Sequence, residues 1–198
     1  MKIDNYSQLL ELIIRGHAHQ TRNGGNVPYW VHCYRVSKIL EYVLGKTKEG
    51  TPRENRDIVL AGLGHDLYED TKIDREYITK KFGANVDYLI FEATNVYGDH
   101  EIRKYCKKIK GTSETALLIK LADLFDNMIG GAYAIHENGH KWTKDFLWPI
   151  VHQQWLVVSK IKFTRFPKTA SDLKLLASLS HHSLQMAIGN YYQKKANL

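Results

Sequence analysis

Apolar residues recur along this chain at the three- and four-residue spacing of amphipathic helices, and nowhere do they alternate persuasively as in strands. In the first half, capping residues, prolines and glycines indicate where helices begin and end. These signals are a cap at Asp4 or Asn5, a glycine-rich loop over residues 22–26, Pro28 opening a second helix, Gly45 closing it, and a capping box from Thr51 to Glu54. The third helix is predicted to run through residues 58–63 into His65 and Asp66.

The second half of the chain has the same kind of pattern. Its signals are Asp74 capping a short helix that ends at Phe82-Gly83, apolar positions from Val86 to Ala93, Ser113 opening a long helix that Gly130-Gly131 ends, and helical patterns over residues 146–162 and 171–195. Pro149 either begins the first of these last two patterns or kinks it. The pattern as a whole predicts an all-α fold.

The long helix after Ser113 is apolar on nearly all sides, which is typical of a helix at the centre of a fold. Its polar residues Lys120, Asp123 and Asn127 are spaced i, i+3 and i+7, so they share one stripe. A polar stripe on a buried helix needs partners. The stripe therefore marks a candidate site.

A second polar group lies in residues 61–71, where an apolar run meets His65, Asp66, Glu69 and Asp70. If this segment is helical, His65 and Glu69 share one face, and Asp66 and Asp70 share the next. Carboxylates and imidazoles beside a core are costly unless they are paired or coordinate a metal. The segment is the strongest candidate for a functional site.

The composition is that of a globular protein. The 198 residues, 43% hydrophobic and 25% charged, predict one domain spanning residues 1–198. No apolar run is long enough to span a membrane, and an acid stands where a signal peptide would be apolar. Cys33 and Cys106 form neither a CxxC motif nor a disulfide framework. We therefore expect a cytoplasmic protein with free thiols and no membrane partner.

The net charge of +7 is compatible with a polyanionic partner, either nucleic acid or a small molecule such as a nucleotide. The basic residues are scattered except for the cluster at residues 103–110. We interpret that cluster as a solvated helix face rather than a phosphate site. The sequence leaves the oligomeric state open.

Four residues from three predicted helices form a potential metal-binding set: His32, His65, Asp66 and Asp123. Two imidazoles and two carboxylates suit Mn, Fe or a similar divalent ion, whereas closed structural zinc sites are usually rich in thiolates. The alternative, capping and core pairing, requires three helices to place polar groups inward without a shared ligand. A bound divalent ion lowers the pKa of its water, so the set predicts metal-assisted hydrolysis.

Three motifs follow one another in the chain: Pro-Tyr-x-x-His from Pro28 to His32, His-Asp-x-x-Glu-Asp-Thr from His65 to Thr71, and Leu-Ala-Asp-x-x-x-Asn from Leu121 to Asn127. Together they resemble the HD-domain phosphohydrolases, and more narrowly the RelA/SpoT-type hydrolase domain and the small alarmone hydrolases. The resemblance covers roughly residues 8–165 and implies an all-α HD helical bundle. The predicted helix over residues 171–195 lies beyond it.

The resemblance also implies an activity and a role for each matching residue. The activity is hydrolysis of ppGpp or pppGpp that removes pyrophosphate from the 3′ position. The matching residues are His32, His65, Asp66 and Asp123 as ligands of a single Mn²⁺ ion, Glu69 and Asp70 as the acids that handle water and leaving group, and Arg22, Tyr29 and Asn127 as substrate contacts.

The chain departs from the family pattern at positions that would meet the nucleotide. Only Arg22 is basic in the loop before Pro28, Leu124 replaces a basic residue, and Asp126 replaces a histidine or tyrosine. An HD phosphohydrolase acting on another nucleotide or phosphorylated metabolite is therefore the alternative. A non-catalytic module that binds nucleotide or nucleic acid is more remote, since extra carboxylates do not help to bind phosphates.

One competing motif, His136-Glu-Asn-Gly-His140, satisfies the H-E-x-x-H pattern of zinc proteases. That chemistry needs both histidines on one face of a regular helix, whereas Asn138-Gly139 is a strong turn signal. We interpret the segment as a loop near the mouth of the pocket, where His140 or Lys141 could touch substrate.

Overall fold

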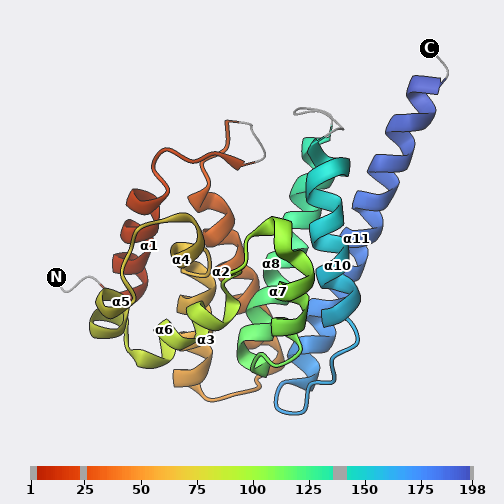
Figure 1. Ribbon diagram of the computed structural model, residues 1–198. Coiled ribbons are helices and arrows are strands. Elements are labelled where there is room, and N and C mark those ends of the chain that lie inside the picture. Colours follow the sequence, from red (N-terminus) through yellow and green to blue (C-terminus); the bar gives the residue numbers. More distant parts are fainter. Residues whose placement is uncertain (1–3, 23–25, 136–141, 197–198) are drawn as a thin grey trace.

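The computed structural model describes residues 4–22, 26–135 and 142–196, which fold into helices joined by short loops (Figure 1). The helices of the first half are α1 (Asn5–Gly16), α2 (Trp30–Thr47), α3 (Pro52–Leu63), α4 (Leu67–Asp70), α5 (Arg75–Phe82) and α6 (Ala84–Ala93). Those of the second half are η2 (Asp99–Glu101), α7 (Ile102–Ile109), α8 (Glu114–Ala134), η3 (Thr143–Leu147), α10 (Trp148–Val158) and α11 (Pro167–Ala196). Across the described residues, β-structure is limited to an isolated bridge between Thr21 and Pro28. The all-α prediction is confirmed.

Local capping signals set most helix starts, as the sequence predicts. The Asp4 side chain accepts a hydrogen bond from the backbone N–H of Ser7 at 2.8 Å and caps α1. Thr51 caps α3 in a complete capping box. Asp74 caps α5 and Ser113 caps α8 in the same way. Each cap satisfies a backbone N–H that the first helical turn leaves unpaired.

Two predicted helix ends are wrong. α2 continues past Gly45 to Thr47, and its C-cap is Lys48, whose φ of 57° is left-handed. α8 continues through Gly130-Gly131 to Ala134. A Cβ built on Gly131 would lie 2.3 Å from Cδ2 of Leu147, so the glycine admits the Leu147 side chain rather than ending the helix.

Further boundaries differ by a turn or more from the sequence-based ones. α1 ends at Gly16, well before the glycine-rich loop. Pro149 lies in the first turn of α10, which follows directly on the π-helical segment η3. α11 begins at Pro167, ahead of the predicted start.

α8 is the central helix, and it contacts α2, α3, α6, α10 and α11. The residues along it that are fully buried include Leu118, Leu121, Leu124 and Met128. α11 packs along α8, and its C-terminal turns extend beyond the rest of the molecule (Figure 1). This arrangement places the middle of α8, where Asp123 lies, against α2 and α3.

Both cysteines are free and buried. The basic residues 103–110 lie on and just after α7, where Lys108 Nζ donates to the carbonyl oxygens of Phe91 and Thr94. Within the part of the chain that the structure describes, no helix is long and apolar enough to cross a membrane.

Candidate active site

His65 and Asp66 lie in a break between two helices. α3 ends at Leu63, and Gly64 donates its backbone N–H to the carbonyl oxygens of Leu60 and Ala61 before α4 begins at Leu67. The predicted continuous helix through this segment is therefore wrong. The break lets His65 and Asp66 point toward one place instead of occupying adjacent helix faces.

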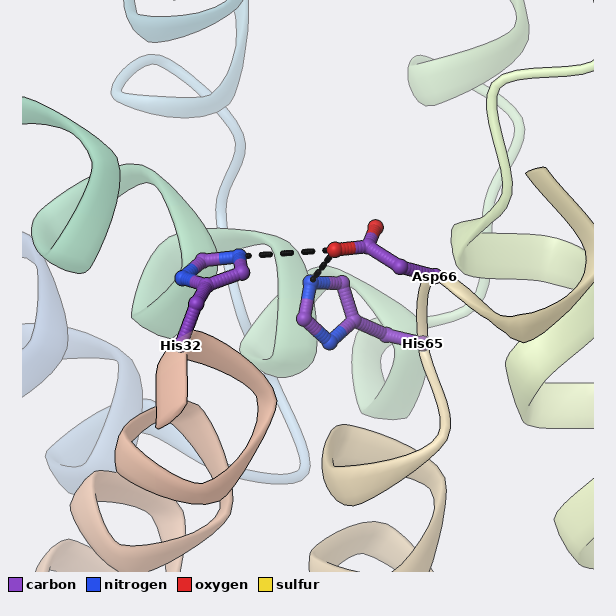
Figure 2. A group of neighbouring side chains, drawn as sticks. All are labelled: His32, His65 and Asp66. Atoms are coloured by element: carbon purple, nitrogen blue, oxygen red, sulfur yellow. Dashed lines mark ion pairs between the residues drawn. The ribbon is translucent and has the colours of Figure 1, made fainter. Parts of the chain in front are cut away.

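The side chains of His32 and His65 converge on the carboxylate of Asp66 (Figure 2). Asp66 Oδ2 lies 3.1 Å from His65 Nε2 and 3.5 Å from His32 Nε2. The potential ligand atoms of these three residues all lie within 4.8 Å of one another. Asp123 joins them from α8, with its Oδ1 3.1 Å from His32 Nε2 and 3.5 Å from His65 Nε2. The structure thus brings the four predicted ligands together.

The donor set fits a divalent metal ion. His65 Nδ1 is hydrogen bonded to the carbonyl oxygen of Gly62 at 2.8 Å, whereas its buried Nε2, although 3.1 Å from Asp66 Oδ2, makes no hydrogen bond. An unpaired buried imidazole nitrogen beside two carboxylates is costly, and a cation between them removes that cost. Mixed nitrogen and oxygen ligands from His and Asp suit Mn, Fe and similar ions.

The charges of the four groups are strongly coupled. Burial opposes ionisation of His65, but the neighbouring carboxylates of Asp66 and Asp123 raise its pKa well above the usual value. Burial likewise opposes ionisation of Asp66 and Asp123, yet their cationic neighbours hold both carboxyl pKa values well below the usual range. A metal ion bound here would compete with protons for the imidazole nitrogens.

A cavity of about 500 Å³ opens over this cluster. The lining residues include the predicted acids Glu69 and Asp70, the ligands Asp66 and Asp123, the predicted substrate contacts Arg22, Tyr29 and Asn127, and also Trp142, Phe146, Leu147 and Gln154. The rings of Trp142 and Phe146 lie 5.9 Å apart, tilted by 34°. The cavity lining therefore combines acidic and aromatic side chains.

The Glu69 carboxylate accepts a hydrogen bond from the backbone N–H of Asn95 at 2.9 Å. The pKa of Glu69 is raised to about 7. The largest cause is desolvation of its carboxyl group in the cavity wall, and the second is the nearby negative charge of Asp66. The same two causes raise the pKa of Asp70. A carboxyl group with a pKa near neutrality can both accept and return a proton, which is what acid–base chemistry requires.

The predicted substrate contacts are already bonded to the ligand cluster. Tyr29 donates its hydroxyl hydrogen to Asp66 Oδ2 at 2.9 Å. Asn127 Nδ2 donates to Asp123 Oδ1 at 2.6 Å, and Asn127 Oδ1 accepts from Arg22 at 2.8 Å. Their contact with substrate stays a prediction, and their visible role is to orient two potential metal ligands.

Two charged residues contact the ligands without having been assigned a role from the sequence. Lys120 Nζ donates to Asp123 Oδ2 at 2.8 Å, which completes the predicted polar stripe of α8. Asp126 accepts a hydrogen bond from His32 Nδ1 at 2.7 Å. Sequence reasoning treated Asp126 only as a departure from the family pattern. Its spacing of three residues from Asp123 on a buried helix was the available signal.

The segment His136–His140 and Lys141 lie outside the described residues. Neither the protease-like motif nor the predicted contact of His140 or Lys141 with substrate is therefore placed.

The HD domain family matches residues 10–128, more than half of the chain. The chain belongs to the HD-domain family.

Its relatives include hydrolases of one kind. The guanosine-3′,5′-bis(diphosphate) 3′-pyrophosphohydrolase MESH1 of Drosophila melanogaster is 32% identical over 130 residues, which cover 62% of this chain and 67% of that protein. The enzyme of the same name from Borreliella burgdorferi is 29% identical over 70% of this chain, but the match spans only 20% of its length. A solved structure described as a metazoan ortholog of SpoT that hydrolyses ppGpp shares the fold, with a TM-score of 0.69 and 22% identity, over 92% of this chain and 97% of that one.

Proposed function

We propose that this protein is a metal-dependent phosphohydrolase that removes pyrophosphate from the 3′ position of guanosine polyphosphates, ppGpp or pppGpp. The observation that carries the proposal is the convergence of His32, His65, Asp66 and Asp123 beneath a cavity whose wall contains Glu69 and Asp70. The activity for which the fly and Borreliella relatives are named supports the choice of substrate.

The residues of the cluster would hold one divalent ion, for which we propose Mn²⁺ because the ligand set mixes imidazole and carboxylate. Such an ion supplies a hydroxide near neutral pH and polarises a phosphoryl oxygen. Tyr29 and Asn127 keep Asp66 and Asp123 oriented through hydrogen bonds of 2.9 and 2.6 Å. Oriented ligands need little rearrangement when substrate arrives, which favours catalysis.

Glu69 and Asp70 are the groups we propose for proton transfer. Both line the cavity, and both have carboxyl pKa values raised by desolvation and by the negative charge of Asp66. Glu69, with a pKa of about 7, is suited to accept a proton from the attacking water. The Asn95 backbone N–H holds its carboxylate in the wall at 2.9 Å.

The aromatic part of the cavity lining is suited to a nucleoside. Trp142 and Phe146 offer aromatic faces, and aromatic faces stack on bases without selecting among them. The same cavity thus contains potential hydrolytic groups and potential base-binding groups, as a nucleotide substrate requires.

The alternative, another nucleotide or phosphorylated metabolite as substrate, rests on Leu124. This residue lines the cavity where the family pattern has a basic side chain, so it offers no charge to a phosphate. Asp126, a second departure, is hydrogen bonded to His32 and Arg35 and lies 3.8 Å from Arg22 Nη2. Of these two departures, only Leu124 lies in the cavity lining.

The substrate is tested by incubating the Mn²⁺-loaded protein with ppGpp, pppGpp and a panel of other nucleotides and phosphate esters. We expect release of pyrophosphate from ppGpp and pppGpp. Turnover of another ester, with none of ppGpp, would establish the alternative substrate class.

The roles of the acids are tested with Glu69→Gln and Asp70→Asn. Each change keeps the shape of the side chain but removes proton transfer, so turnover should fall by roughly 10²–10⁴-fold while metal content stays constant. Glu76→Gln, on the exposed side of α5, is the matched control and should keep full activity. Unchanged turnover in Glu69→Gln would contradict the assignment. Nucleotide binding without turnover in the wild-type protein would point to the non-catalytic alternative.

A further inference from the structure

Asp126 lies behind the cluster of potential metal ligands rather than in the cavity wall. It is a residue of α8, only 2% exposed; its carboxylate contacts two side chains of α2, and its Oδ2 also lies 3.8 Å from Arg22 Nη2. His32 Nδ1 lies 2.7 Å from Oδ2. Arg35 donates from Nε to Oδ1 at 2.6 Å and from Nη2 to Oδ2 at 2.9 Å. This two-pronged pairing with a guanidinium is the geometry of an ionised carboxylate.

The contact determines which nitrogen of His32 carries a proton. An ionised carboxylate only accepts hydrogen bonds, so Nδ1 of His32 must be the donor. The neutral imidazole then has its lone pair on Nε2. That atom is the one that faces the cluster, 3.1 Å from Asp123 Oδ1 and 3.5 Å from Asp66 Oδ2.

The other histidine of the cluster, His65, also has its Nδ1 hydrogen bonded, but to a neutral acceptor. His65 Nδ1 is bonded to the carbonyl oxygen of Gly62, a neutral acceptor, at 2.8 Å. A carboxylate partner makes an imidazole a stronger donor to a metal than a neutral carbonyl does. The two histidines of the cluster therefore differ in the group that is hydrogen bonded to Nδ1, a carboxylate for His32 and a carbonyl for His65.

Asp126 acts from outside the substrate cavity. It lines, together with Arg35, a second cavity of about 780 Å³ between α2 and α8. Among the described residues that line the active-site cavity, neither Asp126 nor Arg35 occurs. Neither Asp126 nor Arg35 is therefore placed to touch a substrate bound over the cluster.

We propose that Asp126 and Arg35 form a positioning pair for the metal ligand His32, fixing its Nδ1–H tautomer and its ring orientation so that Nε2 is presented to the ion. The pair rests on the metal centre of the proposed function but not on the identity of the substrate. It also gives the departure at position 126 a physical reason, because the buried carboxylate is compensated by Arg35 from α2.

The first test needs no variant. In wild-type protein loaded with diamagnetic Zn²⁺, long-range ¹H–¹⁵N correlation spectra distinguish the two nitrogens of each imidazole. We expect His32 to carry its proton on Nδ1 and to bind Zn²⁺ through Nε2. Coordination through Nδ1, or a His32 ring without bound metal, would overturn the proposal.

The second test compares matched variants. Asp126→Asn removes the charge behind His32, and the affinity for Mn²⁺, measured by calorimetry without substrate, should fall by about 10–100-fold. Asp87→Asn is the control, because Asp87 is also paired through two bonds with an arginine, Arg75, at 2.9 and 2.8 Å, but on α5 and α6. It should keep wild-type affinity.

A further variant covers the case in which Asp126→Asn fails to fold. The Arg35 side chain is 41% exposed, so Arg35→Gln should fold and weaken Mn²⁺ binding in the same direction. Arg75→Gln, at 44% exposure, is its control. Wild-type Mn²⁺ affinity in folded Asp126→Asn or Arg35→Gln would overturn the positioning role. Loss of affinity in a protein that leaves ppGpp intact would preserve that role and contradict only the proposed substrate.

Discussion

Glu69 has a carboxyl pKa of about 7, and this has a consequence for stability as well as for proton transfer. The folded state holds the proton on Glu69 at pH values where the unfolded chain has already released it. Where the folded state binds more protons, the free energy of unfolding falls as pH rises. In metal-free protein, Glu69 should therefore lower stability progressively between its ordinary pKa of about 4.3 and its folded value of about 7.

This expectation is checked by urea denaturation of chelator-treated protein at several pH values across that window. Glu69→Gln removes the titration, so its stability should fall less steeply with rising pH than that of the wild type. Glu76→Gln, exposed on α5, controls for the loss of one negative charge. Equal slopes in wild type and Glu69→Gln would show that the carboxyl is not perturbed in the folded state.

At the scale of single residues, the sequence indicates which side chains are candidate ligands better than it indicates which side chains they contact. His32, His65, Asp66 and Asp123 are recognisable because few reasons other than a shared ligand put such groups on apolar helices. The structure brings these four side chains together. The bond from His32 to Asp126 joins residues 94 positions apart, and no local pattern contains it. It depends on how α2 packs against α8.

At the scale of the helices, a helix start depends on residues close together in the sequence. The cap of α3 allows the contribution of one such start to stability to be measured. Thr51 accepts a hydrogen bond from the Glu54 N–H, and the Glu54 side chain accepts one from the Thr51 N–H. Thr51→Ala should lower the free energy of unfolding by about 1 kcal/mol. Calorimetric melting measures the loss, and Thr51→Ser, which keeps the hydroxyl, should retain wild-type stability. A loss of equal size in Thr51→Ser would mean that the cap is not its cause.

Helix ends and breaks depend on tertiary contacts, which explains why they were harder to predict. Gly131 reads as a stop signal in the sequence, yet it lies inside α8 because Leu147 occupies the space of its missing side chain. Gly64 is similar, since a Cβ there would lie 2.7 Å from Cδ1 of Ile90 on α6. In both places the glycine serves packing between helices, and only the folded structure reveals the neighbouring side chain.

At the scale of the whole molecule, the potential metal ligands link segments that are distant in the chain. His32 comes from α2, His65 and Asp66 from the break after α3, and Asp123 from α8. These elements also share the core, so an ion held by all four ligands would bind the folded state and not the unfolded chain. Ligands with that property stabilise a protein by mass action.

Metal removal should therefore lower the melting temperature. An ion present at 100 times its dissociation constant adds about 2.7 kcal/mol of stability. For a domain of this size each kcal/mol is worth roughly 2–4 °C, so MnCl₂ added to chelator-treated protein should raise Tm by roughly 5–11 °C. His65→Ala removes a ligand and should lose most of the rise, whereas His19→Ala, at an exposed position, should retain it. An equal rise in both variants would place the bound Mn²⁺ elsewhere, and no rise in the wild type would contradict the metal centre itself.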